Sequence, residues 1–432
     1  MLLEFSVENF RGFKDEAIFS MTKPSFKTIL PKNGQSWADV VVPAAGIFGA
    51  NASGKTTLLE AMMHLARAVA VPGMALYLPY KLGPVSEQPT KYSLDFVVDG
   101  VRYAYTVHAL RWGIGFEELL SYPKGTARLL FRREQESRDA EMILKLGSTL
   151  KGITTVIRKR TKPTRLFLGV AYREEHAFLE KVARGIALEA NIEVILHSDF
   201  VRDRNLAWVT RQVAENPHEW SSISQVLANA ADLGIVRVEV DEEELDSKLL
   251  EDLKNQLHDL MEDQEVEIPE ELVTQIRRSL IFFHRGEDGK EYSLSLREQS
   301  DGTKSWLALS GQVFDALKNG KVLIVDELDS GLHSVLVAEL ARMFGDSTLN
   351  KGGAQLIFNS HDTTLLGNAP TRLLQPWQVW FTEKKNDGSS ELYSLQDFDT
   401  RAGNNEQKRY LAGGFGAIPS PNMQQIYRYM GE

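Results

Sequence analysis

The first residues of the chain alternate between apolar and polar side chains, which is the period-2 pattern of a strand with one buried face. The opening LLEFSVENF therefore predicts a half-buried strand. A second apolar run, Val40–Phe48, leads into the segment GANASGKTT and then into Leu58–Val69, where apolar residues recur at helical spacing. This order predicts a strand, a glycine-rich loop and a helix.

From about Lys91 to Leu146 the sequence changes to short alternating runs, among them KYSLDFVVDG and VRYAYTVHAL. Asp99-Gly100 between these two runs is a strong signal for a tight hairpin turn, because such turns need residues that accept a positive φ. We expect an antiparallel sheet here, attached to the strand–loop–helix core.

Helical spacing dominates from Arg165 to about Leu280, where EEHAFLEKVARGIALEA and LDSKLLEDLKNQLHDLMEDQ both have the pattern of amphipathic helices. The region is too short for a long coiled-coil arm with a return strand, so we expect a compact helical insertion. The acidic run Asp241–Glu244 within it is expected to be solvated.

Strand patterns return after Leu280. Val322–Val325 predicts a buried strand, Gln355–Asn359 a second one, and Trp377–Leu395 a hairpin that turns at Asn386-Asp387-Gly388. The predicted fold class is α/β, with a core split between the two ends of the chain, an antiparallel β subdomain and a helical insertion. The corresponding division is into residues 1–164, 165–280 and 281–432.

Composition and length fit a globular protein. The 432 residues are 43% hydrophobic and 25% charged, and the length exceeds that of a usual single domain. Cysteine is absent, which excludes disulfides, thiolate metal sites and cysteine nucleophiles and agrees with a reducing compartment. The start MLLEFSVENFRGF lacks a signal-peptide pattern and no apolar run could span a bilayer, so we expect a cytoplasmic protein without a membrane partner.

The net charge of −10 disfavours a uniformly basic nucleic-acid binder. Lys151–Arg165 (KGITTVIRKRTKPTR) is the local exception, with basic residues and no acidic one. It is either a solvated loop or hairpin, or a contact to nucleic acid or to an acidic partner.

Gly49–Thr56 (GANASGKT) matches the phosphate-binding pattern G-x-x-x-x-G-K-[ST] in full. In such a loop successive backbone N–H groups surround the phosphates, and the following helix points its N-terminus at them. Lys55 would neutralise β- and γ-phosphate charge, and Thr56 would bind Mg²⁺ through its hydroxyl oxygen. The residues expected to bind ATP in this segment are Asn51, Ala52, Ser53, Gly54, Lys55, Thr56 and Thr57.

Lys321–His333 (KVLIVDELDSGLH) combines a buried strand with two carboxylates at its end. Asp326 is the candidate Mg²⁺ ligand, directly or through water. Glu327 stands where a general base would polarise the attacking water. Together with the phosphate loop, these residues predict an Mg²⁺-dependent ATP hydrolase.

Two further elements occur in the order that an ABC-class ATPase requires. SDGT (Ser300–Thr303) precedes the carboxylate strand, and His361 follows the next strand. In ABC-class ATPases a Ser-x-Gly element opens a helix that caps the γ-phosphate held by the opposite subunit, and a histidine contacts the γ-phosphate of its own subunit. Ser300 and Gly302 are therefore candidate ATP contacts, and His361 a candidate catalytic residue. Each alone would suggest only a capped helix or a structural histidine.

These motifs, together with ENFRGF (Glu8–Phe13), REQSDGT and FNSHDTTLL, resemble the ABC-like AAA-family ATPases of the AbiLi type, relatives of the OLD, RecF and SMC ATPases. The resemblance covers both ends of the chain and leaves the helical middle unmatched. It implies ATP and Mg²⁺ as cofactors and a head-to-tail homodimer, with larger assemblies open. It also implies that Arg11 lies beside the nucleotide and that Asp329 touches the partner subunit.

Many proteins of that type serve bacterial anti-phage or abortive-infection systems with a separately encoded effector, sometimes RloB-like, so the resemblance implies such a partner. The chain departs from the family pattern in two places. Leu374–Trp377 (LQPW) replaces an expected charged stretch, and Gln88, the nearest candidate for the Q-loop glutamine, fits a loop residue better.

Other functions stay open at this point. One is a RecF- or SMC-like ATPase that repairs or senses DNA, or a scaffold locked by ATP; Glu327 favours turnover, and the acidic charge disfavours DNA. Another is an OLD-type nuclease, which would need a TOPRIM domain. The sequence after Pro370 is too short for one beside the hairpin, and its single Asp-x-Asp pair, Asp397 and Asp399, fits solvated loop carboxylates better.

Overall fold

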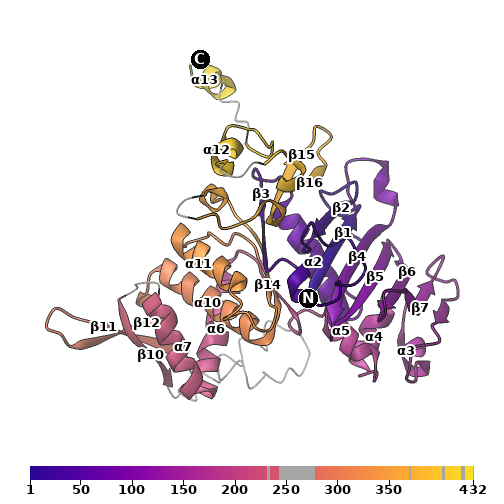
Figure 1. Cartoon of the computed structure of the whole chain (residues 1–432), viewed down its shortest axis with the longest axis horizontal. Coiled ribbons are helices and arrows are strands. Elements are labelled where there is room, and N and C mark those ends of the chain that lie inside the picture. Colours follow the sequence, from indigo (N-terminus) through magenta and orange to yellow (C-terminus); the bar gives the residue numbers. More distant parts are fainter. Residues whose placement is uncertain (231–233, 243–277, 369–370, 401–403, 420–423, 432) are drawn as a thin grey trace, which may run out of the picture. The chain divides into compact units, whose positions relative to one another are not determined.

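The structure is a computed structural model that describes residues 1–230, 234–242, 278–368, 371–400, 404–419 and 424–431. The chain forms two compact units, whose elements are labelled in Figure 1. Unit 1 consists of Met1–Leu196, Ala316–Asp329 and Val337–Glu432, and unit 2 of His197–Asp315 and Ser330–Leu336. Both ends of the chain therefore build unit 1, as the predicted split core requires.

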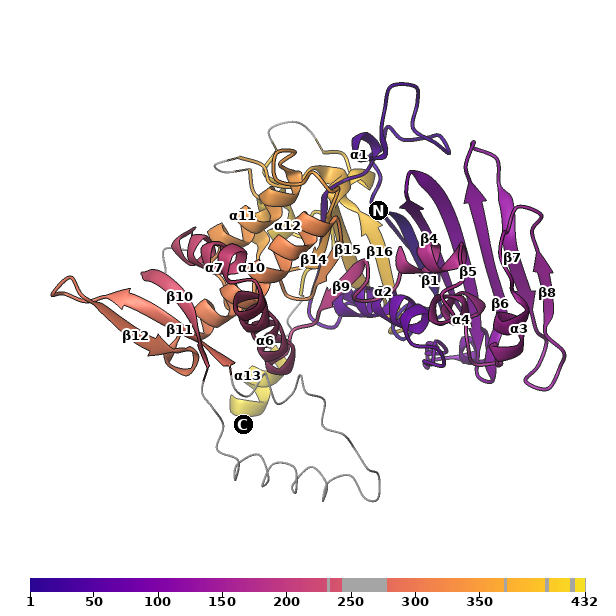
Figure 2. The same ribbon diagram turned by 90° about the horizontal axis from the view of Figure 1, so that it is seen from below.

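Unit 1 contains an antiparallel sheet of seven strands. In spatial order these are β2 (Ala17–Ser20), β1 (Leu2–Glu8), β4 (Thr90–Val98), β5 (Val101–Leu110), β6 (Gly113–Tyr122), β7 (Arg128–Glu134) and β8 (Ile143–Leu146). Figure 2 shows β4, β5, β6, β7 and β8 of this sheet side by side. Asp99 and Gly100 join β4 to β5 with φ of 47° and 76°. The predicted antiparallel sheet and its tight turn are confirmed.

The second sheet of unit 1 has six strands. Their order is β16 (Ser390–Ser394), β15 (Val379–Lys384), β3 (Ala44–Phe48), β14 (Gln355–Asn359), β13 (Val322–Val325) and β9 (Ile192–Ile195). All neighbours pair in parallel except β15 and β16, which form the predicted hairpin. Every residue of β3, β13 and β14 is buried, as expected for parallel strands covered on both faces.

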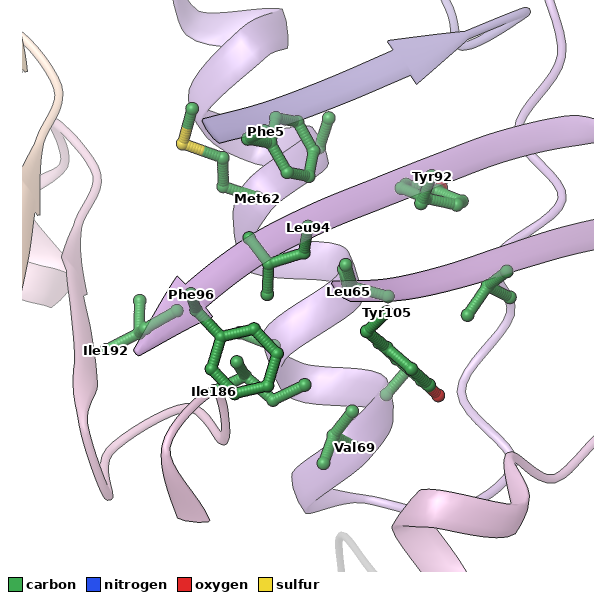
Figure 3. Packing of buried hydrophobic residues seen from close by; sticks show 14 of the residues in the cluster. Phe5, Met62, Leu65, Val69, Tyr92, Leu94, Phe96, Tyr105, Ile186 and Ile192 are labelled. Carbon is green, nitrogen blue, oxygen red and sulfur yellow. The ribbon is translucent and has the colours of Figure 1, made fainter. Parts of the chain in front are cut away.

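Helix α2 (Lys55–Ala70) lies in the largest hydrophobic cluster of unit 1. Its Met62 and Leu65 pack with Phe5 and Leu94 of the antiparallel sheet, as Figure 3 shows. Ile324 of the parallel sheet belongs to the same cluster. One continuous core therefore joins both sheets through α2 and fixes the start of that helix.

Shorter elements complete unit 1. They are α1 (Trp37–Val40), η1 (Pro84–Glu87), α3 (Thr155–Arg160), α4 (Phe167–Arg173), α5 (Leu179–Arg184), η3 (Thr363–Leu366), η4 (Pro376–Gln378), η5 (Leu395–Asp397), α12 (Glu406–Leu411) and α13 (Gln424–Gly431), while α11 (Ser334–Gly345) begins in unit 2. Helix α4 packs against α2. Among the described helices, none is both long and apolar enough to cross a membrane.

Unit 2 combines helices with a small antiparallel sheet. Its elements are α6 (Asp199–Glu215), α7 (Pro217–Ala230), β10 (Ile235–Glu242), β11 (Arg278–Arg285), β12 (Glu291–Ser295), η2 (Leu296–Glu298) and most of α10 (Asp301–Asn319). The strand order is β10-β11-β12. The ring of Trp220 lies 5.1 Å from that of Trp208 and 5.6 Å from that of Phe314, so aromatic contacts hold the three helices together.

The expectation of a compact helical insertion over residues 165–280 is wrong in part. Its first portion, up to Leu196, belongs to unit 1 and ends in β9, which extends the parallel sheet. β10 is a strand because IVRVEVDE alternates apolar and polar residues, a signal that the helical interpretation overlooked. Of EEHAFLEKVARGIALEA, only α5 is helical. The second predicted helix and residues 243–244 lie outside the described residues.

Lys151–Arg165 contains the short helix α3 instead of a hairpin or an irregular loop alone. Arg158 lies 3.8 Å from a Glu141 carboxylate oxygen, and Arg160 pairs with Glu174. Part of the positive charge of this segment is therefore neutralised within the chain itself.

Candidate functional site

The predicted phosphate loop connects β3 to α2. Gly49 and Gly54 have φ of 154° and 118°, values that residues with a side chain rarely adopt. A Cβ atom on Gly49 would lie 2.4 Å from the carbonyl oxygen of Thr382 on β15, and one on Gly54 would lie 2.8 Å from Oγ of Ser390 on β16. Only glycine fits at both positions, so the β15–β16 hairpin fixes the path of the loop.

The same hairpin connects the loop to the ENFRGF segment. Oγ of Ser53 and Oγ1 of Thr382 form a hydrogen bond of 2.6 Å. The backbone N–H of Ser390 donates to the carbonyl oxygen of Gly12 at 2.7 Å. Sequence reasoning missed Thr382 and Ser390, because no local pattern marks a hydroxyl group in a distant hairpin as part of the site.

Lys55 is the first residue of α2, and its side chain is buried. Its Nζ atom donates to the carbonyl oxygens of Gly49 at 2.8 Å and Ala50 at 3.0 Å. Burial lowers the pKa of Lys55, and nearby carboxylates oppose that shift. These carboxylates all belong to the segment after β13 and are Glu327, Asp326 and Asp329. The ammonium group thus lies inside the loop, within electrostatic reach of the predicted catalytic carboxylates.

The other predicted phosphate contacts occupy the loop and the first turn of α2. Asn51 and Ala52 are exposed, Ser53 is buried and Thr57 is half-buried. N–H groups in a first helical turn have no intrahelical partner and attract anions. The loop therefore offers donors to a polyphosphate.

The hydroxyl of Thr56 donates to Oδ1 of Asp326 at 2.7 Å. Asp326 follows β13 directly, and its N–H donates to the carbonyl oxygen of Ile195 at 2.8 Å. Hydroxyl and carboxylate oxygens are the ligands that Mg²⁺ takes beside water and phosphate. The Thr56–Asp326 pair therefore fits an Mg²⁺ ion whose other ligands would come from phosphate and water.

Asn359, the last residue of β14, contacts both Asp326 and the backbone of Glu327. It is fully buried, and its Nδ2 atom donates to Oδ1 of Asp326. Its Oδ1 atom accepts the N–H of Glu327 at 2.6 Å. Glu327 has a φ of 51°, which is unusual for a residue with a side chain. Sequence reasoning missed Asn359, although a polar residue ending a buried strand was an available signal.

His361 and Asp329 meet at the same edge of the parallel sheet. The N–H of His361 donates to Oδ1 of Asp329 at 3.2 Å, and the His361 side chain is exposed. The structure thus brings the predicted γ-phosphate contact together with the loop that follows the carboxylate strand.

Arg11 lies beside α2. Its guanidinium group pairs with Glu60 of that helix and lies 5.6 Å from the centroid of the Phe10 ring. Its backbone has a φ of 46° and donates to the carbonyl oxygen of Leu78 at 2.7 Å. The ENFRGF turn therefore holds an arginine next to the helix that follows the phosphate loop.

Ser300 and Gly302 lie in unit 2, at the start of α10. Oγ of Ser300 accepts the N–H of Thr303 at 3.1 Å, as an N-cap residue does. A Cβ atom on Gly302 would lie 3.1 Å from the carbonyl oxygen of Gly331, so the start of α10 lies close to the segment after the carboxylate strand. The prediction that SDGT opens a helix is confirmed.

Gln88 and the Asp-x-Asp pair have other surroundings. Gln88 follows η1 with an exposed side chain, and its carbonyl oxygen accepts Nδ2 of Asn9 at 2.8 Å. Oδ2 of Asp397 accepts the N–H of Ser394 at 3.1 Å, which caps η5, and the carbonyl oxygen of Asp399 accepts from Arg409. Hydrogen bonding within the turn accounts for Asp397 without a metal ion.

The family model described as "AAA domain, putative AbiEii toxin, Type IV TA system" matches residues 44–367 of the chain. These residues include the phosphate loop, Asp326, Glu327 and His361. No curated protein matches the chain.

Several solved structures of SMC heads align with most of the chain. An Smc head bound to the C-winged helix domain of ScpA has 10% identity and a TM-score of 0.42 over 91% of this chain and 97% of that one. The SMC head domain from Thermotoga maritima has 11% identity and a TM-score of 0.39 over 91% and 98%. A Pyrococcus furiosus Smc head with an extended coiled coil, bound to the C-terminal domain of ScpA, has 12% identity and a TM-score of 0.37 over 91% and 96%. Because these sequence identities and TM-scores are low, the fold is assigned from the strand order and strand pairing of this chain alone.

Proposed function

The chain belongs to the AAA-domain family described for AbiEii-type proteins, and we propose that it is an Mg²⁺-dependent ATPase. One observation carries this proposal. Lys55 and Thr56 of the phosphate loop lie beside the carboxylates that follow β13, with Thr56 hydrogen-bonded to Asp326 at 2.7 Å. A polyphosphate cradle beside a metal-binding carboxylate and a second, adjacent carboxylate is the equipment for phosphoryl transfer to water.

Each residue then has a role in hydrolysis. The loop N–H groups and Lys55 bind and orient the phosphates, and Thr56 with Asp326 would hold Mg²⁺, which neutralises phosphate charge when bound. Glu327 accepts a proton from the attacking water. His361, at the same edge of the sheet, contacts the γ-phosphate.

We also propose that the active form is a head-to-tail homodimer, either alone or as part of a larger assembly. Ser300 and Gly302 start α10 with donor groups at a capped helix end, which is a suitable place for the γ-phosphate of a second copy. The resemblance to ABC-class ATPases supports this arrangement, and Asp329 would then touch the partner subunit.

The biological setting that we propose is bacterial anti-phage defence, with a separately encoded effector. The description of the family as AbiEii-type and the motif resemblance to AbiLi-type ATPases support it. A DNA-sensing ATPase is the second candidate, because α3 carries three consecutive exposed basic residues, Arg158, Lys159 and Arg160. The acidic partners of Arg158 and Arg160 weaken that candidate.

The test is phosphate release from ATP by the wild-type protein and by Glu327→Gln. We expect Mg²⁺-dependent hydrolysis by the wild type. The variant should bind ATP, lose hydrolysis and accumulate as a dimer in light scattering, because only the proton acceptor is removed. Glu391→Gln is the matched control, since Glu391 is an exposed glutamate on β16 that pairs with Lys385. Hydrolysis by Glu327→Gln at the wild-type rate would remove Glu327 as the base.

A further inference from the structure

Asn359 is a buried amide at the end of an otherwise mainly apolar strand. The residues before it in β14 are Gln355, Leu356, Ile357 and Phe358, and all five side chains are fully buried. A buried amide costs free energy unless its donors and acceptor are hydrogen-bonded. Its presence therefore needs an explanation in its contacts.

Those contacts run to two adjacent residues of the neighbouring strand's end. The amide nitrogen donates to Oδ1 of Asp326, and the amide oxygen accepts the N–H of Glu327 at 2.6 Å. The backbone carbonyl oxygen of Asn359 also accepts the N–H of Leu328 at 3.1 Å. Because the side chain uses one donor and one acceptor, neither an ionised aspartate nor an aliphatic residue could make both hydrogen bonds.

The contact to Glu327 supports a backbone conformation that is otherwise unfavourable. A residue with a side chain at a φ of 51° is held in the left-handed region only where its surroundings stabilise it. The amide oxygen of Asn359 supplies such a contact, and the backbone conformation of Glu327 sets the direction in which its carboxylate leaves the strand.

We propose that Asn359 is a positioning residue for the ATPase reaction: it orients the carboxylate of Asp326 toward the metal position and fixes the backbone of Glu327. This inference rests on the proposed function. Asn359 also stands two residues before His361, whose N–H donates to Asp329. The end of β14 thus contacts the carboxylate of Asp326 and the backbone of Glu327, and it leads directly to the predicted γ-phosphate contact.

The test compares Asn359→Asp and Asn359→Leu with the wild type. The aspartate has nearly the same shape and still accepts from the N–H of Glu327, but in its ionised form it cannot donate to Asp326 and places a second negative charge beside it. The leucine makes neither hydrogen bond. We expect kcat to fall roughly 10- to 100-fold in both variants, because a hydrogen bond to a charged group is lost. ATP affinity in EDTA should stay at the wild-type value, whereas the gain in affinity on adding Mg²⁺ should shrink.

Gln355→Leu is the matched control on the same strand. Gln355 is equally buried, and its side chain accepts the N–H of Leu2 at 2.6 Å and donates to the carbonyl oxygen of Leu2 at 2.9 Å, away from the carboxylates. Gln355→Leu should lower the thermal unfolding temperature, as Asn359→Leu should, but it should leave kcat and the gain in ATP affinity on adding Mg²⁺ unchanged.

Wild-type kcat and an intact Mg²⁺ effect in the Asn359 variants would overturn the inference, as would equal losses in Gln355→Leu. If Asn359→Leu does not fold, Asn359→Asp decides. The proposed function fails separately: in that case the wild-type protein itself does not hydrolyse ATP.

Discussion

The buried ion pair of Glu117 and Arg133 allows a quantitative prediction about the stability of unit 1. Both side chains are fully buried, and Nη1 of Arg133 lies 3.6 Å from Oε2 of Glu117. Oε1 of Glu117 accepts the hydroxyl of Tyr105 and the N–H of Leu168, each at 2.9 Å, and Oε2 accepts the N–H of Phe167 at 2.7 Å. Glu117 therefore ties the antiparallel sheet to the start of α4, the helix that packs on α2.

Replacing Glu117 by Leu leaves the Arg133 guanidinium buried without a counter-charge, which costs about 3–5 kcal/mol of unfolding free energy. Uncapping α4 adds about 1 kcal/mol. Arg133→Met is milder, about 1–3 kcal/mol, because burial already raises the pKa of Glu117 and the carboxyl group can take up a proton. The double variant then carries no unpaired charge, so its loss should be about 2 kcal/mol smaller than the sum of the single losses.

Urea unfolding of the wild type, both single variants and the double variant gives this coupling free energy. The neighbouring pair Glu118 and Arg132 is the control, because it joins the same two strands at half-exposed positions. Its coupling should stay below about 1 kcal/mol. The reasoning would be refuted if the double variant lost the same unfolding free energy as the sum of the two single losses, to within about 0.5 kcal/mol.

Three further changes test separate parts of the molecule. Gly49→Ala should weaken ATP binding at least about tenfold in calorimetry. The added Cβ would lie 2.4 Å from the carbonyl oxygen of Thr382, and the resulting backbone strain is worth about 1–3 kcal/mol. An unchanged affinity for ATP would contradict this prediction. Ser300→Arg should keep ATP binding and lose phosphate release, because the affected ATP site is the one on the other copy; full hydrolysis would rule out the proposed dimer. Burial lowers the pKa of His176, so only the unfolded state is readily protonated, and the wild type should lose thermal stability as the pH falls below 6.5. His176→Asn, which keeps an acceptor for the N–H of Leu179, should lose less between pH 7 and 5, and an equal loss would count against His176.

The sequence predicted the residues of the site that stand close together in the chain. The phosphate loop and the carboxylates after β13 are local patterns whose flanking strand and helix are also visible, so their placement in unit 1 could be anticipated. The pairing of the two halves followed from the order of the motifs. The β15–β16 hairpin was predicted from its turn residues, but its role was not, because the contact of Thr382 with the loop spans more than 300 positions.

The remaining differences have physical causes. β9 is only four residues long, too short for periodicity to separate a strand from a helix. The role of Asn359 depends on its lying beside the end of β13, and that neighbourhood arises only when β14 pairs with β13 in the parallel sheet. Residues defined by strand pairing are invisible to motif reasoning, even where the motif itself is found.

Binding of the ATP phosphates around Lys55 is tested most directly by the affinity for ATP with Mg²⁺, measured by calorimetry on the wild type and on Lys55→Met. Methionine keeps the length of the buried stem and removes the charge that faces the loop carbonyl oxygens. We predict an affinity lower by roughly 10- to 100-fold, because a hydrogen bond between charged groups is lost. An affinity equal to that of the wild type would show that the triphosphate is not held by this loop.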